Sequence, residues 1–296
     1  MQDMDFLKSF HTAAALLPER LWQAAYTLSE AQRLECEEFR VRLGRPFTAT
    51  VGGQAVLLGG STLVPTAEEL SELLAKATEC SVHTYLEQLW QGFLTTRHGH
   101  RLGICSEAPG KEQRLLRGLS SVNVRIARQV SALGEELSLG EVFSSTLILG
   151  APGSGKTTLL RELCRNLSRH YRVAIADERY EIAACANGQP RFHIGSCDVL
   201  SGGQKRETIP MLLRAMSPQI LAVDEITRES DCGCLLDCAG CGCQLLATAH
   251  GESLFDLQQR PAYRRLLEAR LFDRVILIGR QGGRRTYRME HLEALR

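Results

Sequence analysis

The stretch from Ser145 to Leu160 carries the clearest chemistry in this sequence. It reads as a short apolar strand, a glycine-rich turn and a helix start, and the turn has the pattern Gly150-x-x-x-x-Gly155-Lys156-Thr157. Its glycines let successive backbone N–H groups surround an anion, and the positive end of the helix dipole points at that anion. Because strand, turn and helix follow in the required order, the sequence predicts a phosphate-binding loop for a nucleotide.

The loop residues are expected to play separate parts. Lys156 is expected to act in catalysis by contacting the β- and γ-phosphates, and the Thr157 hydroxyl is expected to bind Mg²⁺. ATP and Mg²⁺ are therefore the predicted cofactors. The residues expected to bind the nucleotide are Gly150, Ala151, Pro152, Gly153, Ser154, Gly155, Lys156, Thr157 and Thr158.

Two acids follow a second apolar strand, Ile220–Val223, later in the chain. This pattern is typical of a Walker B strand, and another predicted strand separates it from the loop. Asp224 is expected to hold a water of the Mg²⁺ shell, and Glu225 to orient or activate the attacking water. The alternative is a loop acid after a buried strand, without a catalytic role.

Two further strand ends carry polar residues. Open parallel sheets bind ligands at the carboxyl ends of their strands, and Glu178 and Arg179 follow the strand that separates the two Walker strands. Glu178 is therefore a second candidate catalytic acid, unless the segment is only a solvated turn of charges. His250 ends the next strand, where it is expected to sense the γ-phosphate through a hydrogen bond unless it is structural.

The segment Leu200-Ser-Gly-Gly-Gln204 matches the signature loop of transporter-type ABC ATPases. The chain between Lys156 and Leu200 is too short for the helical subdomain that those ATPases insert. The residues after Glu225 also lack their Ser-Ala-Leu-Asp type of loop. We therefore interpret the match as a coincidence of glycine-rich loop chemistry.

Two groups of residues have the types and spacing of possible metal ligands. Cys238-x-x-Cys241 has the spacing of a zinc-ligand pair, but no second separated pair follows. The helix-face and strand-face spacing favours small buried hydrophobes over zinc. His98-x-His100 lacks an obvious Cys or carboxylate partner and is expected at a surface turn. The clustered cysteines are Cys232, Cys234, Cys238, Cys241 and Cys243.

The composition narrows the class of protein. The 296 residues carry a net charge of +1 and 44% apolar residues, so nothing demands a nucleic acid or an anionic membrane as partner. The longest uncharged run, 47–67, is rich in glycine and is expected to form strands and turns, not a membrane span. An odd number of cysteines, eleven, and no recognisable signal peptide favour free thiols in a reducing cytoplasm.

Two domains are predicted, a smaller N-terminal α+β domain (1–130) and an α/β domain (131–296). In the second, strands alternate with helices, which predicts a parallel sheet with helices on both faces. Thr66 is expected to cap a helix with Glu69 as its capping-box partner. The expected N-terminal elements are helices within 1–40 and over 66–80 and 82–92, and strands at 37–43, 48–51, 55–58, within 92–105 and at 122–130. The expected C-terminal strands are 146–149, 171–176, 220–223, 244–248 and 274–278, and the helices are 156–169, 208–216, 230–239 and 261–269.

Several longer motifs together resemble the stage III sporulation protein AA family of endospore-forming bacteria. The resemblance covers nearly the whole chain and is more specific than the Walker motifs alone. The motifs are Arg40-x-Arg-x-Gly-Arg-Pro, Gly92-Phe-Leu-Thr-Thr-x-x-Gly-His-Arg-Leu-Gly, Asn123-Val-Arg-Ile-Ala-Arg, Asp177-Glu-Arg-x-Glu-Ile-Ala-Ala, Asp198-Val-Leu-x-Gly-x-x-Lys205, Leu213-Arg-Ala-Met-Ser-Pro-Gln, Val223-Asp-Glu-Ile and Ala247-Thr-Ala-His-Gly.

That family belongs to the secretion-type ATPases, so the resemblance implies a RecA-like P-loop core, ATP hydrolysis and a hexameric ring. It also implies a place in the mother-cell cytoplasm, peripheral to membrane-embedded channel proteins. An N-domain arginine is expected over the nucleotide; Arg125 is chosen, with Arg128 and Arg101 as further candidates. The family's acidic motif falls on Asp177 and Glu178. Cysteines stand where the family pattern has Ala and Gly after the Walker B strand.

Three functions remain open at this point. The first is an ATPase motor that drives assembly or transport at a membrane channel complex. The second is a nucleotide-gated scaffold that binds ATP and barely hydrolyses it, which the intact pair Asp224-Glu225 disfavours. The third is a RecA-like nucleic-acid translocase, which the near-neutral charge disfavours.

Overall fold

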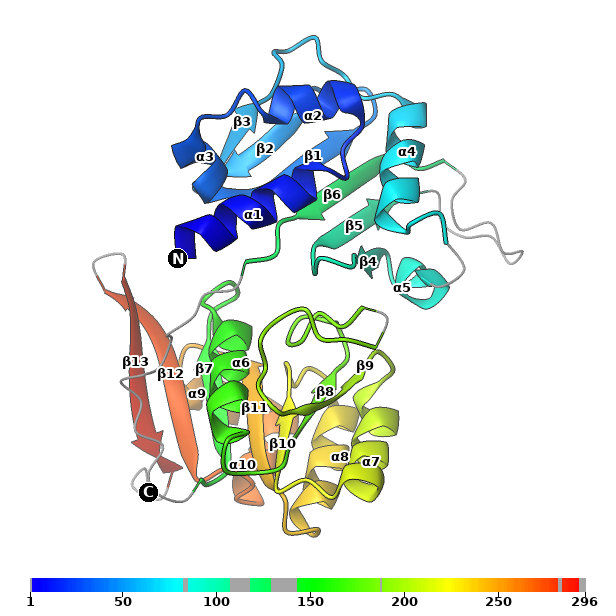
Figure 1. The fold of residues 1–296 in the computed structure, drawn as a ribbon. Coiled ribbons are helices and arrows are strands. Elements are labelled where there is room, and N and C mark those ends of the chain that lie inside the picture. The colour runs from blue at the N-terminus through cyan, green and yellow to red at the C-terminus, as the bar shows by residue number, and fades with distance from the viewer. Residues whose placement is uncertain are drawn as a thin grey trace. The chain divides into compact units, whose positions relative to one another are not determined.

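The computed structural model divides the chain into two compact units, Met1–Gln129 with Cys185–Arg191, and Val130–Ala184 with Phe192–Arg296 (Figure 1). The predicted domain boundary between residues 130 and 131 lies outside the described residues and stays a prediction. The same holds for the start of the helix expected over 82–92 and the end of the strand expected over 122–130. The described residues are 2–81, 85–106, 118–128, 143–186, 188–281 and 284–292.

The first unit contains an antiparallel sheet with the strand order β3-β2-β1-β6-β5-β4. Its described strands are β1 (Cys36–Arg42), β2 (Thr48–Val51), β3 (Gln54–Leu57), β4 (Phe93–Thr95), β5 (Arg101–Cys105) and β6 (Ser121–Arg125). Its described helices are α1 (Gln2–Ala14), α2 (Glu19–Ala25), α3 (Glu30–Glu35), α4 (Ala67–Ala77) and α5 (Leu86–Trp90). This is the predicted smaller α+β unit.

One face of this sheet is buried and the other is polar. Phe39 of β1 is fully buried and meets Phe10 of α1 edge-on at 5.5 Å between ring centroids. Leu70 of α4 belongs to the same apolar cluster. The predicted capping box at the start of α4 is confirmed, because Thr66 N donates to Glu69 Oε2 at 2.9 Å and Glu69 N donates to Thr66 Oγ1 at 3.3 Å.

The helices expected within 1–40 end at Glu35, and the strand expected over 37–43 forms as β1, one residue earlier at each end. One local expectation for this unit was wrong, the surface position of His100. His100 is not at the surface but only 1% exposed, with Nε2 2.9 Å from Thr12 Oγ1. Its Nδ1 accepts a hydrogen bond from Ala127 N, and burial lowers its pKa to about 3, so the ring is neutral and structural.

The second unit contains a mostly parallel sheet with the strand order β13-β12-β7-β11-β10-β8-β9. Its described strands are β7 (Thr146–Gly150), β8 (Val173–Asp177), β9 (Asp198–Ser201), β10 (Ile220–Val223), β11 (Gln244–His250), β12 (Arg274–Gln281) and β13 (Arg284–His291). Its described helices are α6 (Lys156–Leu167), α7 (Lys205–Met216), α8 (Glu229–Ala239), α9 (Leu254–Gln258) and α10 (Pro261–Glu268).

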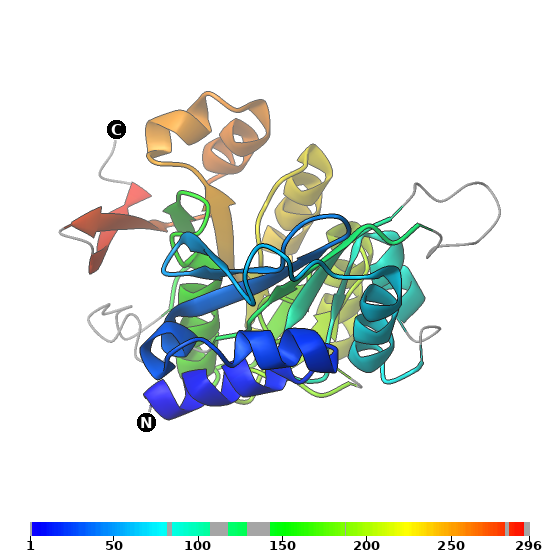
Figure 2. The same ribbon diagram turned by 90° about the horizontal axis from the view of Figure 1, so that it is seen from above.

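Helices cover both faces of this sheet, as predicted. In Figure 1, α6 lies in front of β7, whereas α9 and α10 lie behind the sheet; Figure 2 shows the same layers from above. Ile209 of α7, Leu235 of α8 and Leu266 of α10 join Leu147 and Leu221 of the sheet in one apolar cluster. Every residue of β7, β8 and β10 is buried, which is typical of parallel strands between two helical layers.

The sheet also contains strands that were not predicted. β9 pairs with β8 in parallel, and it occupies the start of the segment that imitates an ABC signature. β13 pairs with β12 in antiparallel fashion, so the predicted parallel sheet carries one antiparallel edge strand. No helix in the described part of the chain is long and apolar enough to span a membrane.

Candidate nucleotide-binding site

The predicted phosphate-binding loop joins β7 to α6 at the carboxyl edge of the sheet. Gly153 and Gly155 have φ values of +71° and +103°, a region that residues with a side chain rarely adopt. A Cβ atom on Gly150 would lie 2.5 Å from Ser154 Oγ. Glycines are therefore required by the curl of this backbone, which ends at the positive end of the α6 dipole, and the loop fits a phosphate chain.

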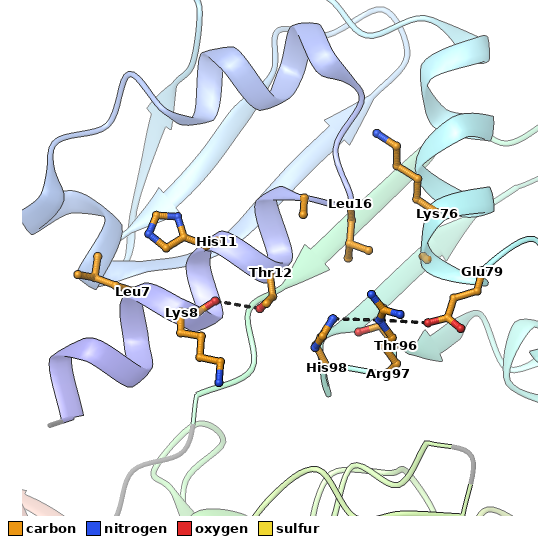
Figure 3. Close-up of a pocket in the computed structure, with 12 residues that line it drawn as sticks. Leu7, Lys8, His11, Thr12, Leu16, Lys76, Glu79, Thr96, Arg97 and His98 are labelled. Carbon is orange, nitrogen blue, oxygen red and sulfur yellow. Dashed lines mark hydrogen bonds and ion pairs between the residues drawn. The ribbon is translucent and has the colours of Figure 1, made fainter.

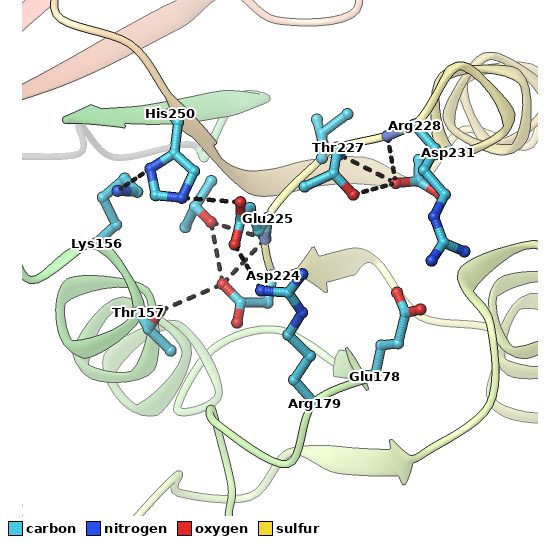
Figure 4. Close-up of polar contacts among 12 residues, drawn as sticks. Lys156, Thr157, Glu178, Arg179, Asp224, Glu225, Thr227, Arg228, Asp231 and His250 are labelled. Carbon is cyan, nitrogen blue, oxygen red and sulfur yellow. Dashed lines mark hydrogen bonds and ion pairs between the residues drawn. The ribbon is translucent and has the colours of Figure 1, made fainter. Parts of the chain in front are cut away.

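Lys156 is the first residue of α6 and is only 6% exposed. Its Nζ donates to Gly150 O and Ala151 O at 2.9 Å each, and it lies 2.9 Å from His250 Nδ1 (Figure 4). Burial lowers the pKa of Lys156, and the nearby Glu225 and Asp224 carboxylates oppose that shift. Because the ammonium group can only donate, His250 Nδ1 accepts, and the proton of the neutral ring lies on Nε2.

Asp224 lies at the end of β10 and is 4% exposed. Its Oδ1 accepts hydrogen bonds from Thr157 Oγ1 at 3.3 Å, from Thr248 Oγ1 at 3.1 Å and from Glu225 N at 3.0 Å. The structure thus brings together the two residues predicted for Mg²⁺, Thr157 and Asp224. A hydroxyl and a carboxylate are hard oxygen donors of the kind that Mg²⁺ prefers, so this pair fits the ion.

Glu225 is held from two sides. Its Oε1 lies 2.8 Å from His250 Nε2, and its Oε2 lies 3.0 Å from Arg179 Nη1 (Figure 4). A continuous chain of hydrogen bonds therefore runs from Lys156 through His250 and Glu225 to Arg179. These side chains come from α6, from the end of β11 and from the segments after β10 and β8, as expected for a site at the carboxyl edge of the sheet.

The segment after His250 is tied back to it. Arg260 Nη1 donates to His250 O at 2.9 Å, just before α10 begins. α9 lies between these two residues, and Ser253 caps its start by accepting a hydrogen bond from Asp256 N. Phe255 on α9 is 67% exposed. His250 is thus fixed at its ring and at its carbonyl oxygen.

Glu178, the second candidate catalytic acid, has a different partner. Its Oε2 lies 2.5 Å from the Nζ of Lys205 at the start of α7, and the Lys205 side chain is only 3% exposed. In Figure 4, no dashed line joins Glu178 to Asp224 or Glu225. The two candidate acids therefore occupy separate ion pairs, and Glu225 is the one linked to the phosphate-binding loop.

Asp177 shapes the loop that follows β8. It is fully buried, and its carboxylate accepts hydrogen bonds from the backbone N–H groups of Glu181, Ile182 and Ala183 at 2.8–3.1 Å. Burial raises its pKa to about 6, and the N–H donors oppose that rise. The acidic residue of the motif that precedes Glu178 thus acts as a loop anchor.

Arg161 of α6 is a residue that sequence reasoning missed. It is 4% exposed and donates to Ile182 O at 2.6 Å and to Glu181 O at 2.7 Å. Its guanidinium carbon lies 3.9 Å from the centroid of the Phe192 ring, and burial lowers its pKa to about 10. An arginine inside a helix usually predicts a solvated position, so only its contacts reveal that it holds the same loop as Asp177.

The arginines predicted in the first unit differ in their surroundings. Arg125 is exposed at the end of β6, in register with Arg101 on β5. Arg128 donates to Cys36 O and lies over the Phe6 ring, so it belongs to the packing of its own unit. Arg125 is therefore the better candidate of the two for contacting a nucleotide. That role of Arg125 stays a prediction.

The second unit contains an arginine against the phosphate-binding loop that the sequence did not indicate. Arg285 of β13 is exposed, and a Cβ atom on Gly155 would lie 3.0 Å from its Cζ. Arg285 comes from the unpredicted antiparallel strand, so no motif pointed to it. Arg228 precedes α8, and its backbone N–H donates to Asp231 Oδ2 at 3.0 Å.

The clustered cysteines pack mainly as small apolar residues. Cys232, Cys238 and Cys243 are buried in the cluster that α8 shares with the sheet, whereas Cys241 is exposed. Burial raises the pKa of Cys238 to about 12, so its thiol is protonated. Within the described ranges, no three His, Cys, Asp or Glu side chains gather in a way that could hold a metal ion.

A separate pocket of about 710 Å³ lies in the first unit (Figure 3). Figure 3 shows Arg97 between His98 and Glu79, at 3.0 and 3.1 Å from its Nε. Lys8 and Lys76 lie on the same rim, and Leu7 and Leu16 form part of an aliphatic wall. The described lining contains none of the residues predicted for the nucleotide.

Comparison with known proteins places the chain in a family. The family described as "Sporulation stage III, protein AA" matches residues 19–289. "Stage III sporulation protein AA" of Bacillus subtilis (strain 168) is 38% identical over 282 residues, which cover 91% of each chain. "Uncharacterized protein ycf45" of Cyanidium caldarium is 31% identical over 151 residues, which cover 48% of this chain and 44% of that protein.

Two solved structures share the fold. The ATPase DotB of Legionella pneumophila has a TM-score of 0.58 and 17% identity, and the match covers 88% of this chain and 78% of DotB. The pilus retraction motor PilT with bound ADP has a TM-score of 0.63 and 15% identity, with 88% and 81% covered. At such identities the likeness shows the fold alone, and it confirms the predicted α/β core. The chain therefore has the fold of these ATPases and belongs to the sporulation stage III protein AA family.

Proposed function

We propose that this chain binds ATP with Mg²⁺ and hydrolyses it as a secretion-type motor. The motor would drive assembly or transport by a membrane channel complex during endospore formation, from the mother-cell cytoplasm. The observation that carries the proposal is the hydrogen-bonded chain from Lys156 to Glu225, next to Asp224. Membership of the sporulation family and the fold shared with PilT, whose structure contains ADP, support it.

Binding would use groups already in place. Lys156 would exchange its hydrogen bonds to Gly150 O and Ala151 O for the β- and γ-phosphate oxygens, which are stronger, charged acceptors. Thr157 and, through water, Asp224 would hold Mg²⁺, which would neutralise part of the phosphate charge. The backbone N–H groups of the loop would surround the β-phosphate.

Hydrolysis would use Glu225 as the general base. A water oxygen would attack the γ-phosphorus, the bond to the β–γ bridging oxygen would break, and Glu225 would accept the proton of the water. His250 would connect ATP binding to the activation of Glu225. When Lys156 turns toward the phosphates, His250 Nδ1 loses its donor, and the ring can move relative to Glu225. Nucleotide binding would thereby release the base.

A nucleotide-gated scaffold is the second candidate, and one observation favours it. His250 and Arg179 hold the Glu225 carboxylate from two sides, so it must turn toward the attacking water before it can accept a proton. A chain in which this movement is rare would bind ATP and hydrolyse it slowly. Tight ATP binding without measurable phosphate release would favour the scaffold.

The assembly is also part of the proposal. We propose a homo-oligomeric, hexameric ring in which Arg125 supplies a cation to a nucleotide, and membrane-embedded channel proteins as partners. The exposed position of Arg125 supports this choice, since a cation bound elsewhere would not be available. Specific activity that rises with protein concentration is the expected sign of sites completed by neighbouring subunits.

Steady-state phosphate release by the purified chain with Mg²⁺ and ATP tests the proposal. Wild type should release phosphate, Lys156→Ala should lose tight ATP binding, and Glu225→Gln should bind ATP without turnover. An ATP affinity that does not change in Lys156→Ala would remove the nucleotide site. Turnover that persists in Glu225→Gln would remove the assigned base.

A further inference from the structure

Arg285 lies directly on the phosphate-binding loop. A Cβ atom on Gly155 would be 3.0 Å from Arg285 Cζ, 3.2 Å from Nε and 3.4 Å from Nη1. The guanidinium group therefore rests on the surface that this glycine leaves bare, one residue before Lys156. The Arg285 side chain is exposed, and no side chain among the described residues forms a hydrogen bond or ion pair with it. Its guanidinium cation lies beside the predicted phosphate site.

The strand order shows which end of the site Arg285 faces. In the order β13-β12-β7-β11-β10, the strand that precedes Asp224 and the strand that ends at His250 lie on one side of β7, and β13 lies on the other. β13 starts at the same edge at which β12 ends, so Arg285, its second residue, is at the carboxyl edge of the sheet. β12 also contacts the loop, because a Cβ atom on Gly150 would lie 3.3 Å from Ile278 Cβ.

The position of β13 on this side of the loop indicates which part of a bound nucleotide Arg285 would contact. Asp224, Glu225 and His250 gather where the γ-phosphate would be cleaved. A triphosphate that passes over the loop then leads its α-phosphate and nucleoside away from these groups, toward β12 and β13. A guanidinium group suits that end, because its planar fork donates to phosphate oxygens.

We propose that Arg285 binds the nucleoside end of ATP and ADP by donating hydrogen bonds to the α-phosphate. The ligand is held by the same chain that supplies the phosphate-binding loop. This inference rests on the proposed ATP site. The α-phosphate keeps its charge while the γ-phosphoryl group is transferred, so the contact is equally strong before and during the reaction. Arg285 therefore sets affinity, whereas a finger arginine would set turnover.

The test compares Arg285→Ala and Arg285→Lys with Arg288→Ala. Arg288 is on the same strand, its side chain is 74% exposed, and it pairs with Glu290 at 2.9 Å, so its variant is a matched loss of charge. Equilibrium binding of ATP and ADP, kcat and KM are measured for each protein. Melting temperatures are expected to stay at the wild-type value, because both side chains are exposed.

Arg285→Ala should weaken both nucleotides about 10-fold, the lower end of the range for a hydrogen bond to a charged group. KM should rise to match while kcat stays within about 2-fold. Arg285→Lys should fall between Arg285→Ala and wild type, and Arg288→Ala should behave as wild type. Wild-type affinity in Arg285→Ala, or a fall in kcat at unchanged affinity, would overturn the inference. A wild-type chain that binds no ATP would instead overturn the proposed function.

Discussion

Replacing Glu225 by Gln tests the proposed base with little change in shape. The amide cannot accept a proton from water, so kcat should fall by about 10²- to 10⁴-fold, the usual contribution of a general base. ATP affinity should stay close to wild type, because Lys156 and the loop backbone are untouched. Single-turnover phosphate release and equilibrium ATP binding measure the two quantities separately.

The cost to stability can be worked out from the contacts of Glu225. The Gln oxygen can still accept a hydrogen bond from His250, but the NH₂ group then faces Arg179. The Arg179 side chain is 45% exposed and can turn to water, so the lost ion pair should cost at most about 1 kcal/mol. For a domain of this size, that shifts the melting temperature by about 2–4 °C.

Glu178→Gln is the matched control, since it makes the same substitution in the other candidate acid. It leaves the ammonium of Lys205 without its carboxylate, and that side chain is only 3% exposed. Breaking a largely buried pair costs about 3 kcal/mol when one partner keeps some exposure, or about 6–12 °C. The two variants should therefore differ in what they lose. Glu225→Gln should keep nearly the wild-type melting temperature and lose turnover, whereas Glu178→Gln should have a clearly lower melting temperature.

Two results would refute this reasoning. Turnover in Glu225→Gln within about 10-fold of wild type would show that Glu225 is not the base. Loss of turnover in Glu178→Gln at an unchanged melting temperature would assign the role of general base to Glu178. The ion pair with Lys205 would then hold Glu178 in place in the absence of nucleotide.

Four further predictions follow from the site. Lys156→Ala should weaken ATP binding by about 10- to 100-fold, measured with a fluorescent analogue, because a charged donor to the phosphates is lost; unchanged affinity would contradict the loop assignment. Arg125→Ala should lower kcat by on the order of 10³-fold, more than it lowers affinity, and wild-type specific activity should rise with protein concentration; normal turnover in the variant and a constant specific activity would contradict the ring. Elemental analysis after mild chelation should find no stoichiometric zinc in the chain, and one zinc per chain would contradict the packing of cysteines 232–243 as core residues. The Asp177 carboxyl has its pKa raised from 3.8 to about 6, so its folded form binds a proton more tightly than its unfolded form. Its contribution to stability should be complete below about pH 4 and lost as the pH rises through about 6. The melting temperature of wild type minus that of Asp177→Asn should fall over that range, and a difference that rises would contradict the shift.

Much of the second unit could be predicted because its strands are short apolar runs between breakers. β10 has the predicted bounds, and β7, β8 and β11 lie within a few residues of theirs. The phosphate-binding loop, Asp224, Glu225 and His250 follow from the rule that parallel strands end at one edge. Once the strands are known to be parallel neighbours, these residues must lie close together, because each follows the carboxyl end of its strand.

The parts that could not be predicted depend on contacts between distant segments. β13 is rich in arginine and polar residues, so its sequence lacks the apolar run of a core strand; it forms because β12 offers an edge to pair with. Arg285 reaches the loop only through that pairing. His100 looked like a surface residue because its partners, Thr12 and Ala127, are far away in the sequence.

The hydrogen bond from Arg260 to His250 O joins the two ends of the eleven-residue stretch 250–260 and closes it into a loop. The segment that carries α9 and the exposed Phe255 is therefore tied at both ends to the strand end that carries His250, by the chain on one side and by Arg260 on the other.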